Sequence, residues 1–431
     1  MDIPLLITIF IIFGLIIVSY SLKNFDFVAI SLLGCFLAAT ITGLVKGIGL
    51  KVFISFIEFE AIIIILSMSI ITKIAAESNI LEFLAVKLFH ISKGDRRLFF
   101  YLLCILTTIL AAIITDVVVV LILAPVVVKI CNHLKTRAGT YLLGMTICIN
   151  IGSIITPFSS GENVIIATYF ELDTLYFIQY FWIFSFLLLF LTIFLLDKFL
   201  LGKEPKIDSN QKKLVLELID ADTMIKNKKM FYFNSIAILI TIILFVILPL
   251  LYLTAAISAI LLVLINRKYM EKSMVDLLGE VEWDIIFFFI SLYVIIGCML
   301  EAGFKEIFEA IPFELLNPFV LCLIILIGVS LISGFVANTP TAIIFLPIVE
   351  TLIGKGFPGI PLIFAFIIGI NLGGNLIPQG AACDMMTLKV AESSGVENMS
   401  YRRLFINGLI FALIHIAASF GYLILLILMF G

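Results

Sequence analysis

Two clusters of polar residues interrupt strongly apolar stretches of this sequence, about half the chain apart. One begins at Thr115 and Asp116, and the other at Asn338 and Thr339. In a membrane protein, side-chain oxygens and unwound backbone carbonyls can replace the water around a sodium ion. Free N–H groups at helix starts can bind an anion without any basic side chain. These residue types therefore predict ion binding, with sodium as a candidate ligand at these four residues.

The two clusters also share the spacing of their helix-breaking residues. Pro125 follows Asp116 by nine residues, and Pro347 follows Asn338 by nine. A second motif, Asn-x-Gly with a Pro seven residues after the Asn, occurs at 150–157 and again at 371–378. Gly and Pro can simply permit kinks and close helix packing, but four motifs at offsets of 222 and 221 residues indicate a tandem duplication. Broken helices paired between two halves are typical of a transporter's binding site.

The candidate ion- and substrate-binding residues are the polar and Gly positions of these motifs. They are Thr115, Asp116, Gly152, Ser153, Thr156, Ser159, Ser160, Asn163, Asn338, Thr339, Thr341, Gly373, Gly374, Asn375, Gly380 and Asp384. Two simpler interpretations stay open: Asp116 and Asn338 are ordinary turn formers, and residues 159–163 are plain helix N-caps.

Three carboxylates fall at membrane depth in this interpretation: Asp116, Glu162 and Asp384. Such groups cost about 2.5–3.5 kcal/mol at a helix centre on insertion scales, so they are functional candidates by default. Asp116 can bind a cation, carry a coupling proton, or do both. Glu162 and Asp384 stand where broken helices resume, and we expect them to be more exposed to water.

Composition places the chain in a membrane. Of its 431 residues 63% are hydrophobic and 13% charged, against about 25% charged in soluble domains. The seven Cys show no CxxC motif or other paired spacing, so they are expected to be buried thiols. The three His form no cluster. With no HExxH or GxSxG motif we expect neither an enzyme nor a resident cofactor. The net charge of −3 is uninformative about nucleic acid, but the sequence has no basic low-complexity tail, and we expect no nucleic-acid partner.

The apolar stretches predict an all-α polytopic membrane protein of two repeats, each with five spans and one re-entrant hairpin. Spans are expected near 4–21, 27–45, 54–76, 140–170 (broken), 174–197, 231–252, 253–266 (short), 283–303, 360–391 (broken) and 403–430. The first of these is read as a span and not as a cleaved signal. Hairpins are expected at 98–132 and 317–353, and interfacial helices at 79–92 and 304–316. The predicted division is repeat 1 at 1–198, a cytoplasmic linker with a short surface helix at 199–230, and repeat 2 at 231–431. A regulatory site in the linker stays open.

An odd number of spans per repeat turns the second copy upside down relative to the first. With both termini outside, the outer loops keep few basic residues, namely Lys46, Lys51, Lys305 and Lys355, and most other Lys and Arg become cytoplasmic. This agrees with the positive-inside rule. We therefore predict inverted repeats in the cytoplasmic membrane, with the first hairpin entering from the cytoplasm and the second from outside.

At these residues the chain resembles the ion transporter superfamily, which contains arsenite permeases, sodium/proton antiporters and divalent anion:sodium symporters. Thr115-Asp116…Pro125 and Asn338-Thr339-Pro340…Pro347 are similar to the family's hairpin turns, and the two Gly/Pro breaks are similar to its broken helices. The resemblance covers nearly the whole chain and implies an elevator-like movement in a homodimer. Asp116 and Asp384 stand where the family usually has Asn, and an extra Asp repels a dianion unless it is protonated or paired with sodium.

Together these features predict a secondary active transporter for a small inorganic or carboxylate anion, coupled to sodium or protons by symport or antiport. A sodium/proton-type cation antiporter is the alternative, and a channel is a third, less favoured interpretation.

Overall fold

The computed structural model describes residues 1–21, 25–204, 212, 215–217, 221–248, 250–270 and 272–430. Within these residues every regular element is a helix, which confirms the predicted all-α class. Eleven of the described helices are long and apolar enough to cross a membrane. The chain is therefore a multi-pass membrane protein.

The helices of the first half follow the predicted order of spans, hairpin and broken helix. They are α1 (Ile3–Ser21), α2 (Phe27–Lys46), α3 (Leu50–Ser55), α4 (Phe59–Glu77), α5 (Ile80–Ile91), α6 (Arg96–Ala111), α7 (Asp116–His133), α8 (Gly139–Gly152), α9 (Gly161–Tyr169) and α10 (Thr174–Phe199). Helices α6 and α7 form the first hairpin, and α8 and α9 are the two halves of the broken helix.

The second half repeats this order after the short helices η1 (Leu201–Lys203) and η2 (Ala221–Met224). It contains α12 (Lys228–Ile247), α13 (Leu251–Met270), α14 (Met274–Gly279), α15 (Trp283–Glu301), α16 (Phe304–Glu309), η3 (Phe313–Leu315), α17 (Pro318–Val336), α18 (Asn338–Gly354), α19 (Gly359–Gly373), η4 (Gly374–Leu376), α20 (Ala382–Ser393) and α21 (Tyr401–Phe430). The second hairpin is α17 and α18, and the second broken helix is α19 and α20.

Two predicted boundaries are wrong. The span predicted as short at 253–266 is a full helix, because α12 already ends at Ile247, and Leu248 has an extended backbone (φ −97°, ψ 129°) just before Pro249. A residue that precedes proline is disfavoured in the helical region. The helix predicted at 304–316 is split into α16 and η3 by Pro312, whereas its counterpart at 79–92 is the single helix α5. Of the predicted linker helix around Leu214 to Leu218, residues 215–217 are helical, and Leu214 and Leu218 lie outside the described residues.

The two halves agree in backbone detail as well as in order. Asn79, just before α5, and Gly303, just before α16, both have left-handed backbone (φ 56° and 100°) and lie 224 residues apart. The helices also pack reciprocally: α2 contacts α15 while its counterpart α13 contacts α4. Exchanged contacts of this kind are what a two-fold relation between repeats produces. That the repeats are inverted in the membrane stays a prediction.

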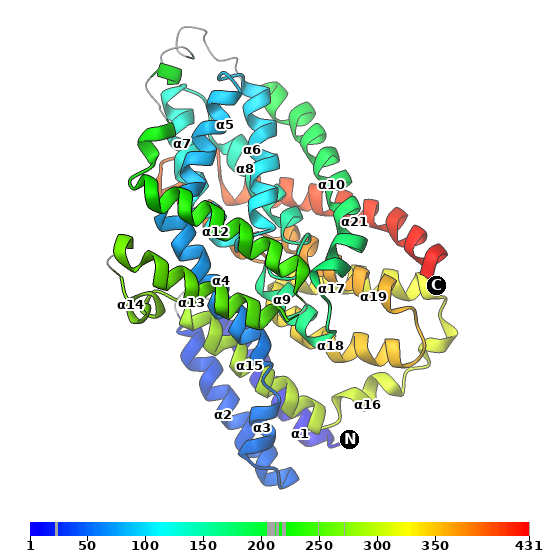
Figure 1. Cartoon of the computed structure of the whole chain (residues 1–431). Helices are drawn as coiled ribbons and strands as arrows, with labels where there is room; N and C mark the ends of the chain where they lie inside the picture. Colours follow the sequence, from blue (N-terminus) through cyan, green and yellow to red (C-terminus); the bar gives the residue numbers. More distant parts are fainter. Residues whose placement is uncertain are drawn as a thin grey trace.

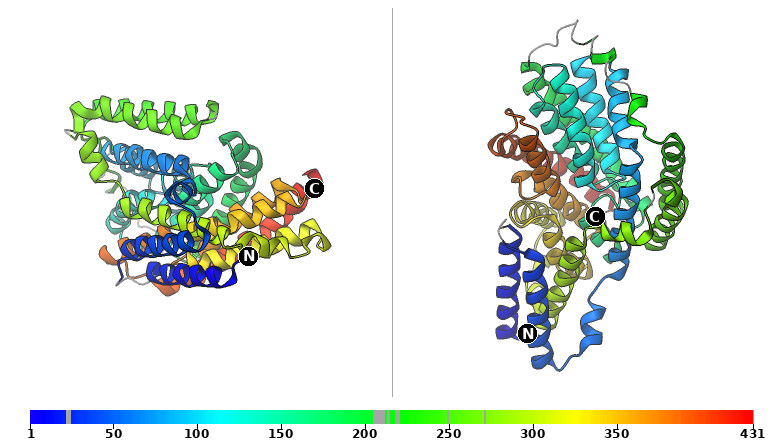
Figure 2. Two further views of the ribbon diagram at one scale, coloured as in Figure 1. Left: turned by 90° about the horizontal axis from the view of Figure 1, so that it is seen from below. Right: turned by 90° about the vertical axis from the view of Figure 1, so that its left-hand side faces the viewer.

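These contacts divide the helices into two groups, which we call the frame and the hairpin unit. The frame is α1, α2, α4, α12, α13 and α15; the hairpin unit is α6 to α10 and α17 to α21. Helices α5 and α16 connect them, since α5 packs on α4, α6 and α7, and α16 packs on α15 and α18. In Figures 1 and 2, α1, α2 and α15 lie at one end of the molecule, while α5 to α8 lie at the other.

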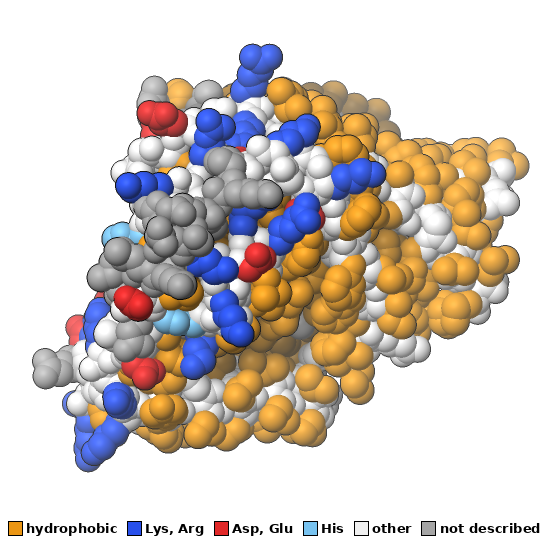
Figure 3. Space-filling model, turned by 90° about the horizontal axis from the view of Figure 1, so that it is seen from above, with side chains coloured by type: hydrophobic (Ala, Val, Ile, Leu, Met, Phe, Trp, Pro, Cys, Tyr) orange, Lys and Arg blue, Asp and Glu red, His pale blue; other side chains and the backbone are white. Residues whose placement is uncertain are grey.

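Charged side chains are distributed unevenly over the surface. Figure 3 looks onto the end of the molecule that carries α5 to α7 and shows many Lys and Arg side chains on the left half of this face. Hydrophobic side chains cover the right half. This distribution favours the predicted cytoplasmic orientation of that end.

Candidate functional site

The turns of the two hairpins, far apart in sequence, meet at one cavity of about 140 Å³. Roughly 30 Å³ is one water's share of liquid volume, so the cavity has room for a small ion with a few ligands. Its polar lining comes from both hairpin turns, the start of α9 and the start of α15: Thr115, Asp116, Ser160, Glu162, Glu282, Asn338 and Thr339.

The first hairpin presents a carboxylate at the start of a helix. Thr115 (φ −54°, ψ 135°) immediately precedes α7, and Asp116 is the first residue of α7. One Asp116 carboxylate oxygen accepts the backbone N–H of Val117 at 2.8 Å. A negative charge is stabilised there by the unpaired N–H groups of the helix end. The half-buried Asp116 thus keeps further oxygen lone pairs for a ligand.

The second hairpin turns through one residue, Ala337, with φ 84° and ψ 161°. That region is nearly restricted to Gly and costs about 1–3 kcal/mol for other residues. The turn is held by Asn338, whose Oδ1 accepts the Ser333 hydroxyl at 2.6 Å and whose Nδ2 donates to Glu162 Oε1 at 3.0 Å. This last bond joins the second hairpin to α9 of the other repeat.

Polar residues between α8 and α9 form hydrogen bonds that fix the loop joining these two helices. The Ser159 hydroxyl and the Asn163 Nδ2 both donate to the Ser153 carbonyl, each at 2.5 Å. Ser160 caps α9 by accepting the Asn163 backbone N–H at 3.4 Å. Thr156 Oγ1 donates to the Ala112 carbonyl at 2.6 Å and so ties the loop to the first hairpin. These bonds hold Ser160 and Glu162 at the cavity.

Each repeat's broken helix also contacts the short half-helix of the other repeat. Asn371 of α19 donates to Asn163 Oδ1 of α9 at 2.9 Å. Conversely, Thr146 of α8 donates to Asp384 Oδ1 of α20 at 2.6 Å, and the Cys383 thiol donates to Asn150 Oδ1 at 3.1 Å. These buried contacts make the hairpin unit one packed body.

Glycine allows the hairpins to lie directly on the broken helices. A Cβ at Gly152 would stand 2.4 Å from the Thr108 carbonyl oxygen, and one at Gly373 would stand 2.5 Å from the Ser330 Cα. Both distances are far inside van der Waals contact. The two residues occupy equivalent places, so the close approach of hairpin and broken helix is a property of both repeats.

Not all of the predicted site residues line the cavity. Six do: Thr115, Asp116, Ser160, Asn338, Thr339 and Gly380. The other ten lie behind it in hydrogen bonds and helix contacts: Gly152, Ser153, Thr156, Ser159, Asn163, Thr341, Gly373, Gly374, Asn375 and Asp384. The expectation that Glu162 and Asp384 are the more exposed carboxylates is wrong, because both are buried while Asp116 is half-buried.

The sequence interpretation missed the side of the cavity that belongs to the frame. Glu282 lines it just before α15, and Tyr20, Phe27, Phe288 and Phe289 supply aromatic walls. Tyr20 stacks on Phe288 with ring centroids 5.0 Å apart. The duplication could have identified Glu282. It follows Glu58 by 224 residues, which is the same separation as that between Asn79 and Gly303.

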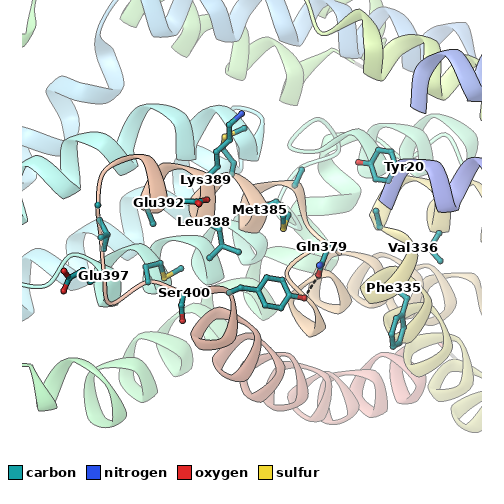
Figure 4. Close-up of a pocket in the computed structure, with 18 residues that line it drawn as sticks. Tyr20, Phe335, Val336, Gln379, Met385, Leu388, Lys389, Glu392, Glu397 and Ser400 are labelled. Atoms are coloured by element: carbon teal, nitrogen blue, oxygen red, sulfur yellow. Dashed lines mark hydrogen bonds between the residues drawn. The ribbon is translucent and has the colours of Figure 1, made fainter. Parts of the chain in front are cut away.

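A much larger cavity, about 1250 Å³, adjoins this site. It runs along α20 to the start of α21, where the Tyr401 hydroxyl donates to Gln379 Oε1 at 2.6 Å (Figure 4). Tyr20, Ala337 and Ala382 line both cavities. We call the larger one the vestibule.

The lining of the site cavity carries three carboxylates, Asp116, Glu162 and Glu282, and no Lys or Arg among its described residues. A cavity with acidic and polar side chains at the junction of two hairpins and two broken helices, within a multi-pass helical fold, is typical of a membrane transporter.

Comparison with known proteins places the chain within this class. It belongs to the citrate transporter family, CitMHS, whose sequence pattern it matches over residues 8–327. An uncharacterized transporter of Mycobacterium tuberculosis is 25% identical over 383 residues, 87% of this chain and 88% of its own.

Two solved structures share the fold at low sequence identity. The YdaH transporter of Alcanivorax borkumensis superimposes with a TM-score of 0.65 at 11% identity, over 91% of this chain and 88% of its own. MtrF of Neisseria gonorrhoeae, described among antimetabolite efflux pumps, gives 0.61 at 12% identity, over 90% and 83%.

Proposed function

We propose that this protein is a secondary active transporter that moves a small anion, a carboxylate in the first instance, together with or against sodium ions or protons. The observation that carries this proposal is the acidic lining of the site cavity by Asp116, Glu162 and Glu282. An anion that enters it alone is repelled by these like charges. Bound sodium or protons remove this repulsion, so anion binding becomes dependent on the cation, which is the requirement for coupling.

A difference in exposure between the two repeats supports transport by alternating access. Helix α20 exposes Ala382, Lys389 and Glu392, whereas residues 162–167 of its counterpart α9 are all buried. In the predicted orientation the vestibule along α20 opens to the cytoplasm, so we assign this structure to the inward-facing state. An elevator-like shift of the hairpin unit along the frame would exchange the surroundings of α9 and α20.

Proteoliposome flux tests the proposal. Labelled citrate and labelled sodium would be measured in parallel, each with and without an imposed sodium gradient and an imposed pH gradient. Uphill citrate accumulation that ends when the gradient is collapsed supports coupled anion transport. Citrate flux that proceeds only downhill, without saturation, would instead indicate a channel.

The same acidic lining favours one alternative, a sodium/proton antiporter. Its signature is labelled sodium uptake driven by a pH gradient in the complete absence of a carboxylate. If such a sodium flux occurs and citrate does not affect it, the protein is a sodium/proton antiporter and the anion proposal is wrong.

A further inference from the structure

The frame contains a second acidic position that the transport site does not use. Glu58 stands immediately before α4, as Glu282 stands immediately before α15. Their two helices occupy equivalent places, since α4 packs on α13 and α15 on α2. In the predicted orientation Glu282 is at the cytoplasmic end of the frame and Glu58 at the outer end.

Glu58 lines a separate cavity of about 190 Å³ between the frame and the hairpin unit. Its other walls include Tyr169 of α9, Tyr293 and Gly297 of α15, and Pro347 of α18. No Lys or Arg is among the described residues that line it.

Tyr293 supplies an independent sign that this cavity receives a ligand. The side chain is 5% exposed, and its hydroxyl has no hydrogen-bond partner among the described residues. A buried hydroxyl without a partner costs about 1–3 kcal/mol. A hydroxyl oxygen and a carboxylate at one cavity form a ligand set suited to a sodium ion or a hydrated proton.

The two cavities differ in what the hairpin unit presents to them. Asp116 and Glu162 line the cavity that contains Glu282, and neither lines the cavity of Glu58. Movement of the hairpin unit toward the outer end would take both carboxylates from Glu282 toward Glu58.

We propose that Glu58 and Tyr293 form an outer entry site for the coupling cation, an inference that rests on the proposed function. Glu282 serves the same purpose on the cytoplasmic side. Each frame carboxylate exchanges the cation with Asp116 and Glu162 in one of the two access states.

The test compares cation entry from the two sides of the membrane. Sodium and pH dependence of labelled citrate flux would be measured in right-side-out and inverted membrane vesicles. For Glu58→Gln we expect the half-saturating cation concentration, sodium or protons, to rise about tenfold for entry from the outer side, with little change from the cytoplasmic side. Glu282→Gln should give the reverse. Tyr293→Phe, which removes only the hydroxyl, should give a smaller change on the outer side alone.

Matched controls are Glu60→Gln and Asp284→Asn, exposed acids two residues further along the same helices and outside both cavities. They should behave as wild type. If Glu58→Gln behaves like Glu60→Gln, or affects both directions equally, the outer site is refuted while coupled transport stands. Wild-type flux that ignores both sodium and pH gradients would refute the proposed function, and the outer site with it.

Discussion

At the scale of single residues, the hydrogen bond between Asn338 and Glu162 is the link that joins the two repeats at the cavity. It places a carboxylate beside a hairpin turn whose backbone is strained at Ala337. The amide orients the carboxylate without neutralising its charge. Charge and hydrogen bond can therefore be separated by mutation.

Glu162→Gln keeps an oxygen that can accept the Asn338 N–H but removes the charge. We expect normal thermal stability in detergent and a large loss of cation-dependent transport. Glu162→Ala leaves the buried amide unpaired and should lower the free energy of unfolding by about 1–3 kcal/mol. Equal destabilisation by both substitutions would show that the Glu162 charge is structural.

Asp116→Asn tests the carboxylate of the first hairpin turn. Asn is isosteric and can still accept the Val117 N–H, so the turn should form. If Asp116 carries the coupling proton, the response of transport to an imposed pH gradient should be abolished. An unchanged pH dependence would reject that role.

The sequence predicted the hairpin-turn residues because each interrupts an apolar run with oxygen-bearing side chains. It could not separate the six that line the cavity from those that stabilise it, because Ser159 or Asn163 can either bind a ligand or close a loop. Only the partner atoms decide, here the Ser153 carbonyl. Glu282 was missed because an acid just before a span resembles an ordinary interfacial residue.

At the scale of elements, the position of each hairpin depends on its close approach to a broken helix. Gly152→Ala and Gly373→Ala would each push a Cβ into backbone atoms of the facing hairpin arm. Overpacking of this kind costs about 1–3 kcal/mol. We expect a lower melting temperature in detergent and reduced transport for both variants.

Gly328→Ala is the matched control, because Gly328 lies on the same hairpin arm as Ser330 and has open space where its Cβ would be. It should be neutral or slightly stabilising, since Ala favours helix by about 1 kcal/mol over Gly. Similar melting temperatures for all three variants would contradict the proposed close packing.

Element positions were largely predictable, because apolar length and Gly/Pro breaks mark spans, hairpins and broken helices directly. The errors fell where one proline set a boundary. In the sequence, α12 ends two residues before Pro249 and α16 ends three residues before Pro312, each within a continuous apolar or amphipathic stretch, so hydropathy alone placed the boundary incorrectly.

At the scale of the whole molecule, the division into frame and hairpin unit is the basis of the proposed mechanism. Besides the connecting helices, α4 packs on α9, α15 on α18 and α12 on α10 across this division, the last with a bond from the Thr174 hydroxyl to the Phe245 carbonyl at 2.6 Å. The sequence indicated the repeats but not this division, which depends on which helices pack together. The homodimer implied by the family resemblance stays a prediction.

The central claim is that the hairpin unit moves against the frame during transport. Cysteines at Thr174 and Phe245, joined by a short reducible thiol cross-linker, would fix the two bodies together. Cysteines at Ile16 and Gly34, both within the frame, are the control pair. We predict that citrate flux in proteoliposomes stops when the first pair is bridged, returns on reduction, and is unaffected by bridging the second pair. Undiminished flux in fully bridged Thr174→Cys/Phe245→Cys protein would contradict the account.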